Sequence, residues 1–165
     1  MTRAVRLAWL LYATAAAAYL LDRLSKLWVQ DALMDRPPID VVPGVLRLTY
    51  TTNSGGAFGL GQSAPWLFAG ATILVSGVII TVSTRLTRPT VAVALGLVLG
   101  GALGNLTDRA MNGSGLSGRV TDFIDLRVWP VFNVADMAVV CGAILLAIST
   151  MHHDGSDGRE PRGEG

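Results

Sequence analysis

Four long apolar segments dominate the pattern of this 165-residue chain and predict four membrane-spanning helices. A helix needs about 20 mainly apolar residues to cross the hydrocarbon core of a bilayer, and each segment approaches or meets that length. The segments cover residues 7–28, 64–84, 89–107 and 128–151. The second lies in a stretch without any charged side chain, and the fourth contains a single charged residue, Asp136.

The first segment has a second interpretation as a cleaved signal peptide. Arg3 and Arg6 precede its apolar core, and the alanines at 15–18 offer a cleavage site with small residues. Apolar residues resume at 19–21, however, and three further spans need the orientation that an uncleaved first helix provides. A retained helix is the simpler prediction.

Residues 37–60, between the first two segments, predict a small β-sheet. Leu46, Leu48 and Tyr50 alternate with polar residues, which is the pattern of a strand. Exposed strand edges cannot lie in hydrocarbon, so the sheet is expected at the outer membrane surface. The predicted fold class is an all-α integral membrane protein with four transmembrane helices and a small extracytoplasmic β-sheet.

The placement of arginines predicts the orientation in the membrane. Arg3, Arg6, Arg85 and Arg88 share one side with the arginines near the C-terminus, and short segments rich in positive charge favour the cytoplasm. Both termini are then cytoplasmic. Residues 1–151 form one membrane-embedded domain, and the polar, glycine-rich residues 152–165 are expected to be a disordered cytoplasmic tail.

Composition agrees with a chain solvated by lipid. Hydrophobic residues make up 51% of the sequence and charged residues only 15%, which departs from ordinary soluble proteins. The net charge of +1 supplies no basic surface for nucleic acid. The single cysteine, Cys141, lies in an apolar run and is expected to be a packing residue, with no disulfide or CxxC pair available.

Polar residues inside membrane spans are costly and are therefore candidates for function. They gather where the spans reach the outer side: Asp22, Lys26, Asn105, Asp108, Arg109, Asn133 and Asp136. Asp22 and Lys26 have the i, i+4 spacing of an ion pair, so a merely interfacial pair is one alternative. Asn105, Asp108 and Arg109 share one helical face, for which a structural clamp is the alternative.

Asn133 and Asp136 repeat the Asn-x-x-Asp spacing on the fourth helix, with Asp136 expected roughly 12 Å below the helix start. Asp122 lies in the preceding loop, near enough in sequence for the two carboxylates to meet. Two such carboxylates hold one proton between them. The ionised member can activate a water while the protonated member polarises a peptide carbonyl, which is hydrolysis without a metal.

Other functions are less consistent with the pattern. The sequence has no HExxH, no GxSxG and no histidine outside the tail, which disfavours zinc and serine hydrolysis. A transporter needs polar groups at several depths, whereas the inner halves of these spans are almost purely apolar. A non-enzymatic membrane scaffold leaves the converging carboxylates unexplained.

Five motifs together resemble those of the lipoprotein signal peptidase family, also called signal peptidase II. They occur in the family's order: DRLSK at 22–26, NSGGAF at 53–58, GGALGNLTDR at 100–109, VTDF at 120–123 and FNVAD at 132–136. The resemblance implies an aspartyl endopeptidase of the bacterial inner membrane. It implies that this enzyme removes signal peptides from diacylglyceryl-modified prolipoproteins and cuts on the amino side of the lipid-bearing cysteine.

The resemblance assigns the catalytic roles to Asp122 and Asp136. Supporting or substrate-binding roles fall on a further set: Asp22, Lys26, Asn53, Gly55, Asn105, Asp108, Arg109 and Asn133. It implies no cofactor and no metal, and it implies prolipoprotein signal peptides and membrane lipids as partners. A monomer would suffice, because one chain contains every group required.

Three residues near the motifs have competing interpretations. Asp125 is outside the family pattern and is interpreted as a loop charge. Phe58 and Trp129 could contact an acyl chain or a signal peptide, or they could belong to an ordinary aromatic belt. The sequence leaves open which aspartate of the pair holds the proton at rest.

Overall fold

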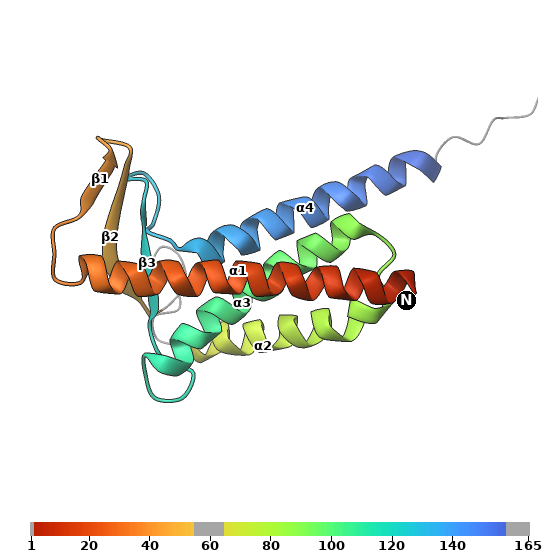
Figure 1. Cartoon of the computed structure of the whole chain (residues 1–165), viewed down its shortest axis with the longest axis horizontal. Helices are drawn as coiled ribbons and strands as arrows, with labels where there is room; N and C mark the ends of the chain where they lie inside the picture. The colour runs from red at the N-terminus through yellow and green to blue at the C-terminus, as the bar shows by residue number, and fades with distance from the viewer. Residues whose placement is uncertain (1, 55–64, 158–165) are drawn as a thin grey trace, which may run out of the picture.

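The computed structural model describes residues 2–54 and 65–157 and has four long helices and a three-stranded sheet (Figure 1). The helices are α1 (Arg3–Leu33), α2 (Pro65–Val82), α3 (Pro89–Met111) and α4 (Val134–Asp157), with a short 3-10 helix η2 (Ser83–Arg85) after α2. The strands are β1 (Ile39–Val42), β2 (Leu46–Asn53) and β3 (Val120–Asp125). All four helices are long and apolar enough to span a membrane. The predicted combination of four spans and a small sheet is confirmed.

The sheet lies at one end of the helix bundle. Figure 1 shows the N-terminus, the α2–α3 connection and the C-terminal end of α4 together at the opposite end. The 31 residues of α1 extend for about 46 Å, which exceeds the roughly 30 Å of a hydrocarbon core. The end of α1 therefore projects toward the sheet, where Val29 and Leu33 pack against Phe123 of β3.

Helix α3 is the centre of the bundle and packs against the other three helices. Its glycines allow two neighbours to approach on different faces. A Cβ atom on Gly100 would lie 2.4 Å from the carbonyl oxygen of Ala15 in α1, and one on Gly101 would lie 2.4 Å from that of Ala135 in α4. Only a hydrogen fits at either position, as is usual where membrane helices pack closely.

The sheet is antiparallel throughout, in the order β1-β2-β3. Asp122, which the sequence suggested was a loop residue, lies in β3 opposite Thr51 of β2. The loop interpretation was wrong because the third strand is formed by pairing with a segment about 70 positions earlier in the sequence. This pairing fixes the course of the backbone that carries Asp122.

The fourth helix begins at Val134 instead of residue 128. Pro130 lacks a backbone N–H, and Phe132 instead forms an isolated bridge with Ile124 of β3. Asp136 consequently lies in the first turn of α4, and its expected depth of roughly 12 Å below the helix start was wrong. At the other end α4 continues to Asp157, so residues 152–157 of the predicted disordered tail are helical.

Substitution of Gly101 by alanine is expected to loosen the contact between α3 and α4. The added Cβ meets backbone, which cannot move away as a flexible side chain can. Such overpacking should cost about 1–3 kcal/mol and lower the Tm of the purified protein in detergent. Gly70→Ala is the matched control, because a Cβ on Gly70 of α2 meets nothing within 4 Å. Equal Tm values for the two variants would contradict the assigned close approach.

Candidate active site

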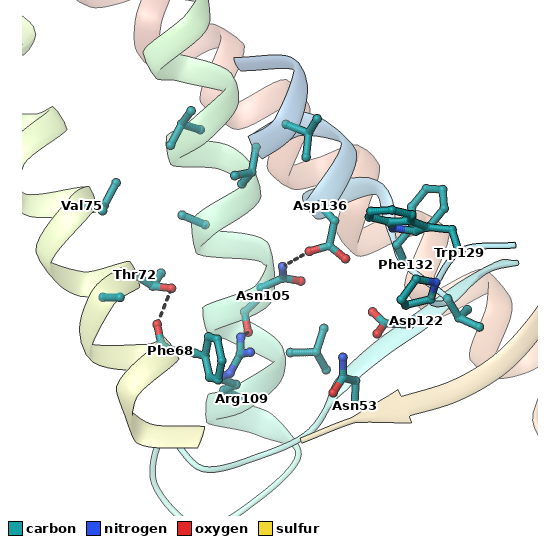
Figure 2. A pocket seen from close by; sticks show the side chains of 18 residues that line it. Asn53, Phe68, Thr72, Val75, Asn105, Arg109, Asp122, Trp129, Phe132 and Asp136 are labelled. Atoms are coloured by element: carbon teal, nitrogen blue, oxygen red, sulfur yellow. Dashed lines mark hydrogen bonds between the residues drawn. The ribbon is translucent and has the colours of Figure 1, made fainter. Parts of the chain in front are cut away.

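Asp122 and Asp136 line the same pocket, although they come from different elements. The pocket has a volume of about 470 Å³ and is bordered by α2, α3, the start of α4 and the segment between β3 and α4. Figure 2 shows the two carboxylates directed toward one space, Asp122 from β3 and Asp136 from the first turn of α4. The two aspartates therefore line one pocket, as their positions in the sequence suggested.

Asn133 and Asp136 cap the N-terminus of α4 reciprocally. The Asn133 Oδ1 atom accepts the backbone N–H of Asp136 at 2.9 Å, and the Asp136 Oδ2 atom accepts the backbone N–H of Asn133 at 3.3 Å. Each side chain thus satisfies a donor that the helix start leaves unpaired. The Asn-x-x-Asp spacing, predicted to place both residues on one face of a helix, is instead a capping box at its beginning.

The cap also fixes which way the Asn133 amide points. Because Oδ1 is committed to a backbone N–H, the NH2 group must face the other side, where it donates to Asp122 Oδ1 at 2.6 Å. One asparagine therefore contacts both aspartates, through its oxygen at Asp136 and through its nitrogen at Asp122.

Lys26 fixes the orientation of the second amide, that of Asn105. The Lys26 ammonium has only donors, so the atom it contacts at 3.0 Å must be Asn105 Oδ1. The Asn105 NH2 group then faces Asp136 and donates to its Oδ1 atom at 2.8 Å (Figure 2). Each carboxylate of the pair is thereby held by an oriented amide donor.

The predicted Asp22–Lys26 ion pair is present and is fully buried. Lys26 Nζ lies 2.8 Å from Asp22 Oδ2 and 2.9 Å from Asp108 Oδ2. Together with Asn105 these acceptors match the three N–H groups of a lysine. Because both side chains are buried, the alternative of an exposed Asp22–Lys26 pair at the membrane interface is excluded.

Asp22 and Asp108 connect this lysine to the elements that carry the two aspartates. Asp22 Oδ1 accepts the backbone N–H of Ala135 in α4 at 2.9 Å. Asp108 Oδ2 accepts the backbone N–H of Thr121 in β3 at 3.1 Å. The residues that follow these two amides in sequence are Asp136 and Asp122 respectively.

Arg23 is a member of this cluster that sequence reasoning missed. Its guanidinium forms an ion pair with Asp108 Oδ1, 85 positions away. Arg23 lies inside the DRLSK motif, and its position beside Asp22 could have indicated a role in the cluster. Only the packing of α1 on α3 identifies Asp108 as its partner.

Arg109 lines the pocket with a nearly buried guanidinium. It donates to the backbone oxygen of Asn105 at 3.3 Å, and its Cζ atom lies 5.8 Å from the centroid of the Phe68 ring. Phe68, from α2, was also missed from the sequence. The arrangement brings a positive charge to the same cavity as the two carboxylates.

Burial and, after it, the negative charge of Asp136 raise the pKa of the Asp122 carboxyl to about 7. Hydrogen bonds from Asn133 and Asn53 and the charge of Lys26 oppose this rise. A carboxyl group with this pKa can hold a proton near neutrality, so Asp122 is the member of the pair suited to be the acid.

The other predicted residues fall at or beside the pocket. Asn53 ends β2, lines the pocket and bonds to Asp122. Trp129 lines the pocket and is also 57% exposed. Gly55 and Phe58 lie outside the described residues. Within residues 2–54 and 65–157, no three His, Cys, Asp or Glu side chains are grouped as metal ligands.

Comparison with known proteins identifies relatives over nearly the whole chain. Residues 14–152 match the family described as Signal peptidase (SPase) II. The lipoprotein signal peptidase of Moorella thermoacetica is 42% identical over 143 residues, covering 86% of this chain and 92% of the relative. That of Syntrophomonas wolfei is 46% identical over 130 residues, covering 78% and 84% of the two chains.

A solved structure has the same fold. It is a bacterial membrane enzyme determined by the in meso method at 2.3 Å resolution, with a TM-score of 0.76 and 26% sequence identity. The superposition covers 92% of this chain and 93% of the other. Sequence and fold agree, and the chain therefore belongs to the signal peptidase II family and is a protease with several membrane spans.

Proposed function

We propose that this protein is an aspartyl endopeptidase that removes the signal peptide from diacylglyceryl-modified prolipoproteins, cutting on the amino side of the lipid-bearing cysteine. The observation that carries the proposal is the pair Asp122 and Asp136, which line one pocket and are each held by an oriented asparagine amide. The substrate class is supported by the relatives, which are lipoprotein signal peptidases.

The two carboxylates divide the work of peptide hydrolysis. Asp122 carries the proton and donates it to the oxygen of the scissile carbonyl, for which its raised pKa is suited. Asp136 takes a proton from the attacking water. Its carboxylate lies at the N-terminus of α4 and accepts hydrogen bonds from the side-chain amide of Asn105 and the backbone N–H of Asn133. When the tetrahedral intermediate collapses, its C–N bond breaks and Asp136 returns its proton to the leaving amine. Asp122 regains its proton from a hydroxyl group of the intermediate as the new carboxyl group forms.

The side chains around the pair support this chemistry by holding its geometry. Asn105 and Asn133 keep the carboxylates from turning away between cycles, since each amide is itself fixed by a second partner. Arg109 lines the same pocket, and its positive charge stabilises the negative charge that develops on the substrate oxygen. Three charged residues support the pair indirectly. Lys26 orients Asn105, Asp22 holds the start of α4, and Asp108 holds β3.

The surroundings of the pocket suit a substrate anchored in lipid. On α1, the side facing away from the buried Lys26 is apolar and exposed at Leu24, Leu27 and Trp28. Apolar exposure at this level indicates that lipid reaches the depth of the pair. The deeper pocket wall is also apolar, formed by Ala71, Val75, Val98, Ala102, Val139 and Val140.

The proposed orientation puts the sheet and the pair on the outer side of the bacterial inner membrane. The arginines of the opposite end, near the N-terminus and after α2, favour the cytoplasm. Both ends of the described chain are then cytoplasmic. A monomer suffices for this mechanism, because every side chain invoked belongs to one chain.

Replacing either aspartate by asparagine should abolish processing while leaving the protein folded. Asp122→Asn cannot exchange a proton as an acid, and Asp136→Asn cannot act as a base, so each variant should lose at least about a hundredfold in rate. The measurement is a gel-shift assay of a diacylated precursor, with Tm as the check on folding. Asp40→Asn, an exposed change on β1, is the matched control and should process normally. Processing at the wild-type rate by either active-site variant would rule out the pair.

The activity should fall as the pH rises through about 7. Asp122 must be protonated to act as the acid, and above its pKa of about 7 the protonated fraction falls tenfold per pH unit. The measurement is kcat/KM between pH 5.5 and 9. Asn53→Ala removes a hydrogen bond that lowers the Asp122 pKa, so its basic limb should move to higher pH. A basic limb that stays in place in this variant would argue against Asp122 as the titrating acid.

Cleavage should depend on the lipid and should expose the modified cysteine. Mass spectrometry of the mature product is expected to find the diacylglyceryl cysteine as its first residue. The same precursor without the lipid is the control and should remain uncut, because it lacks the apolar group that the deeper pocket wall accommodates. Efficient cutting of that control would refute the proposed substrate class.

A further inference from the structure

The segment between β3 and α4 forms one wall of the pocket. Two backbone hydrogen bonds between Ile124 and Phe132, of 2.8 and 3.1 Å, close it into a loop. The side chains of residues 129–132 line the pocket from this loop. Its tip is apolar and open, with Val128 90% exposed and Trp129 57% exposed. Trp129 is thus at the mouth of the pocket and is not a core residue.

The loop turns through a residue in an unusual conformation. Arg127 has φ of +68°, in the left-handed region that is sterically unfavourable for a residue with a side chain. Asp125 compensates directly: its Oδ1 atom accepts the backbone N–H of Arg127 at 2.7 Å. This is the hydrogen bond by which an aspartate side chain stabilises a turn two residues ahead.

The other oxygen of Asp125 forms an ion pair with Arg47. Oδ2 lies 2.5 Å from Arg47 Nε, across the β2–β3 pair in which Arg47 and Asp125 are opposite each other. The Arg127 N–H and then Arg47 hold the pKa of the Asp125 carboxyl below its usual value, against the effect of burial. The carboxylate is nearly buried, does not line the pocket, and connects the sheet to the first bend of the loop.

We propose that Asp125 is a positioning residue for precursor binding. It holds Arg127 in the left-handed conformation, which sets the course of the loop and keeps Trp129 at the pocket mouth. There the indole contacts the apolar part of the bound precursor. The inference rests on the proposed function, since it names how that same pocket holds its substrate.

The test is steady-state kinetics on a diacylated precursor, with the full-length protein in detergent. Asp125→Ala should raise KM about tenfold and leave kcat within about twofold, because the pair of aspartates is untouched. Asp125→Asn should be closer to wild type, since its side-chain oxygen can still accept the Arg127 N–H. Trp129→Ala should raise KM to a similar extent. Asp31→Ala, an exposed change on α1, is the matched control.

The decisive variant is Asp125→Ala combined with Arg127→Gly. Glycine adopts φ of +68° without strain, so it should restore KM to within about threefold of wild type although no hydrogen bond is restored. An unchanged KM in Asp125→Ala, a loss expressed in kcat, or a double variant no better than Asp125→Ala would overturn the inference. Those outcomes leave the catalytic pair intact, whereas processing by Asp122→Asn would refute the proposed function itself.

Discussion

The ammonium group of Lys26 is fully buried, and an unpaired charge inside a membrane protein is so unfavourable that acceptors must surround it. Those acceptors are Asp22 from its own helix and Asp108 and Asn105 from α3. Because the three donors of a lysine diverge, satisfying all of them restricts how α1 can rotate and slide against α3. The glycines of α3 make this possible by allowing the helices to approach, and Gly104 in particular leaves room for the Asp22 carboxylate.

The same carboxylates that neutralise Lys26 also hold the helix and the strand that carry Asp136 and Asp122. Asp22 contacts the second residue of α4, and Asp108 contacts the residue of β3 that precedes Asp122. Helix α4 and strand β3, which are formed by separate parts of the sequence, are thus both hydrogen-bonded to carboxylates that pair with Lys26. Removing one partner would leave a buried charge without compensation, which costs about 3–5 kcal/mol. The cluster therefore fixes the positions of Asp122 and Asp136, although Lys26, Asp22 and Asp108 do not line the pocket themselves.

Much of the fold and of the candidate site could be predicted from the sequence. Hydropathy predicts the membrane spans directly, and helical spacing predicts which polar residues share a face of a helix. Asp22 with Lys26 and Asn105 with Arg109 are contacts or neighbours within one helix, and local spacing suffices for them. The start of α4 and the strand that carries Asp122 could not be predicted in this way. Both depend on β3 pairing with β2 and on the bridge at Phe132, which are contacts between distant segments. Arg23 was missed for the same reason, since its partner Asp108 lies on another helix.

The charges of the cluster favour the single shared proton that the proposed mechanism needs. Four carboxylates, Asp22, Asp108, Asp122 and Asp136, share this region with three cations, Arg23, Lys26 and Arg109. With every group ionised, the region would carry one excess negative charge in surroundings of low polarity, which is unfavourable. A single proton would remove that excess. The carboxylate best placed to take it is Asp122, which is buried, close to Asp136 and without an ion pair to any residue that the structure describes. In the proposed mechanism this charge balance favours a proton on Asp122, and peptide hydrolysis would use that same proton.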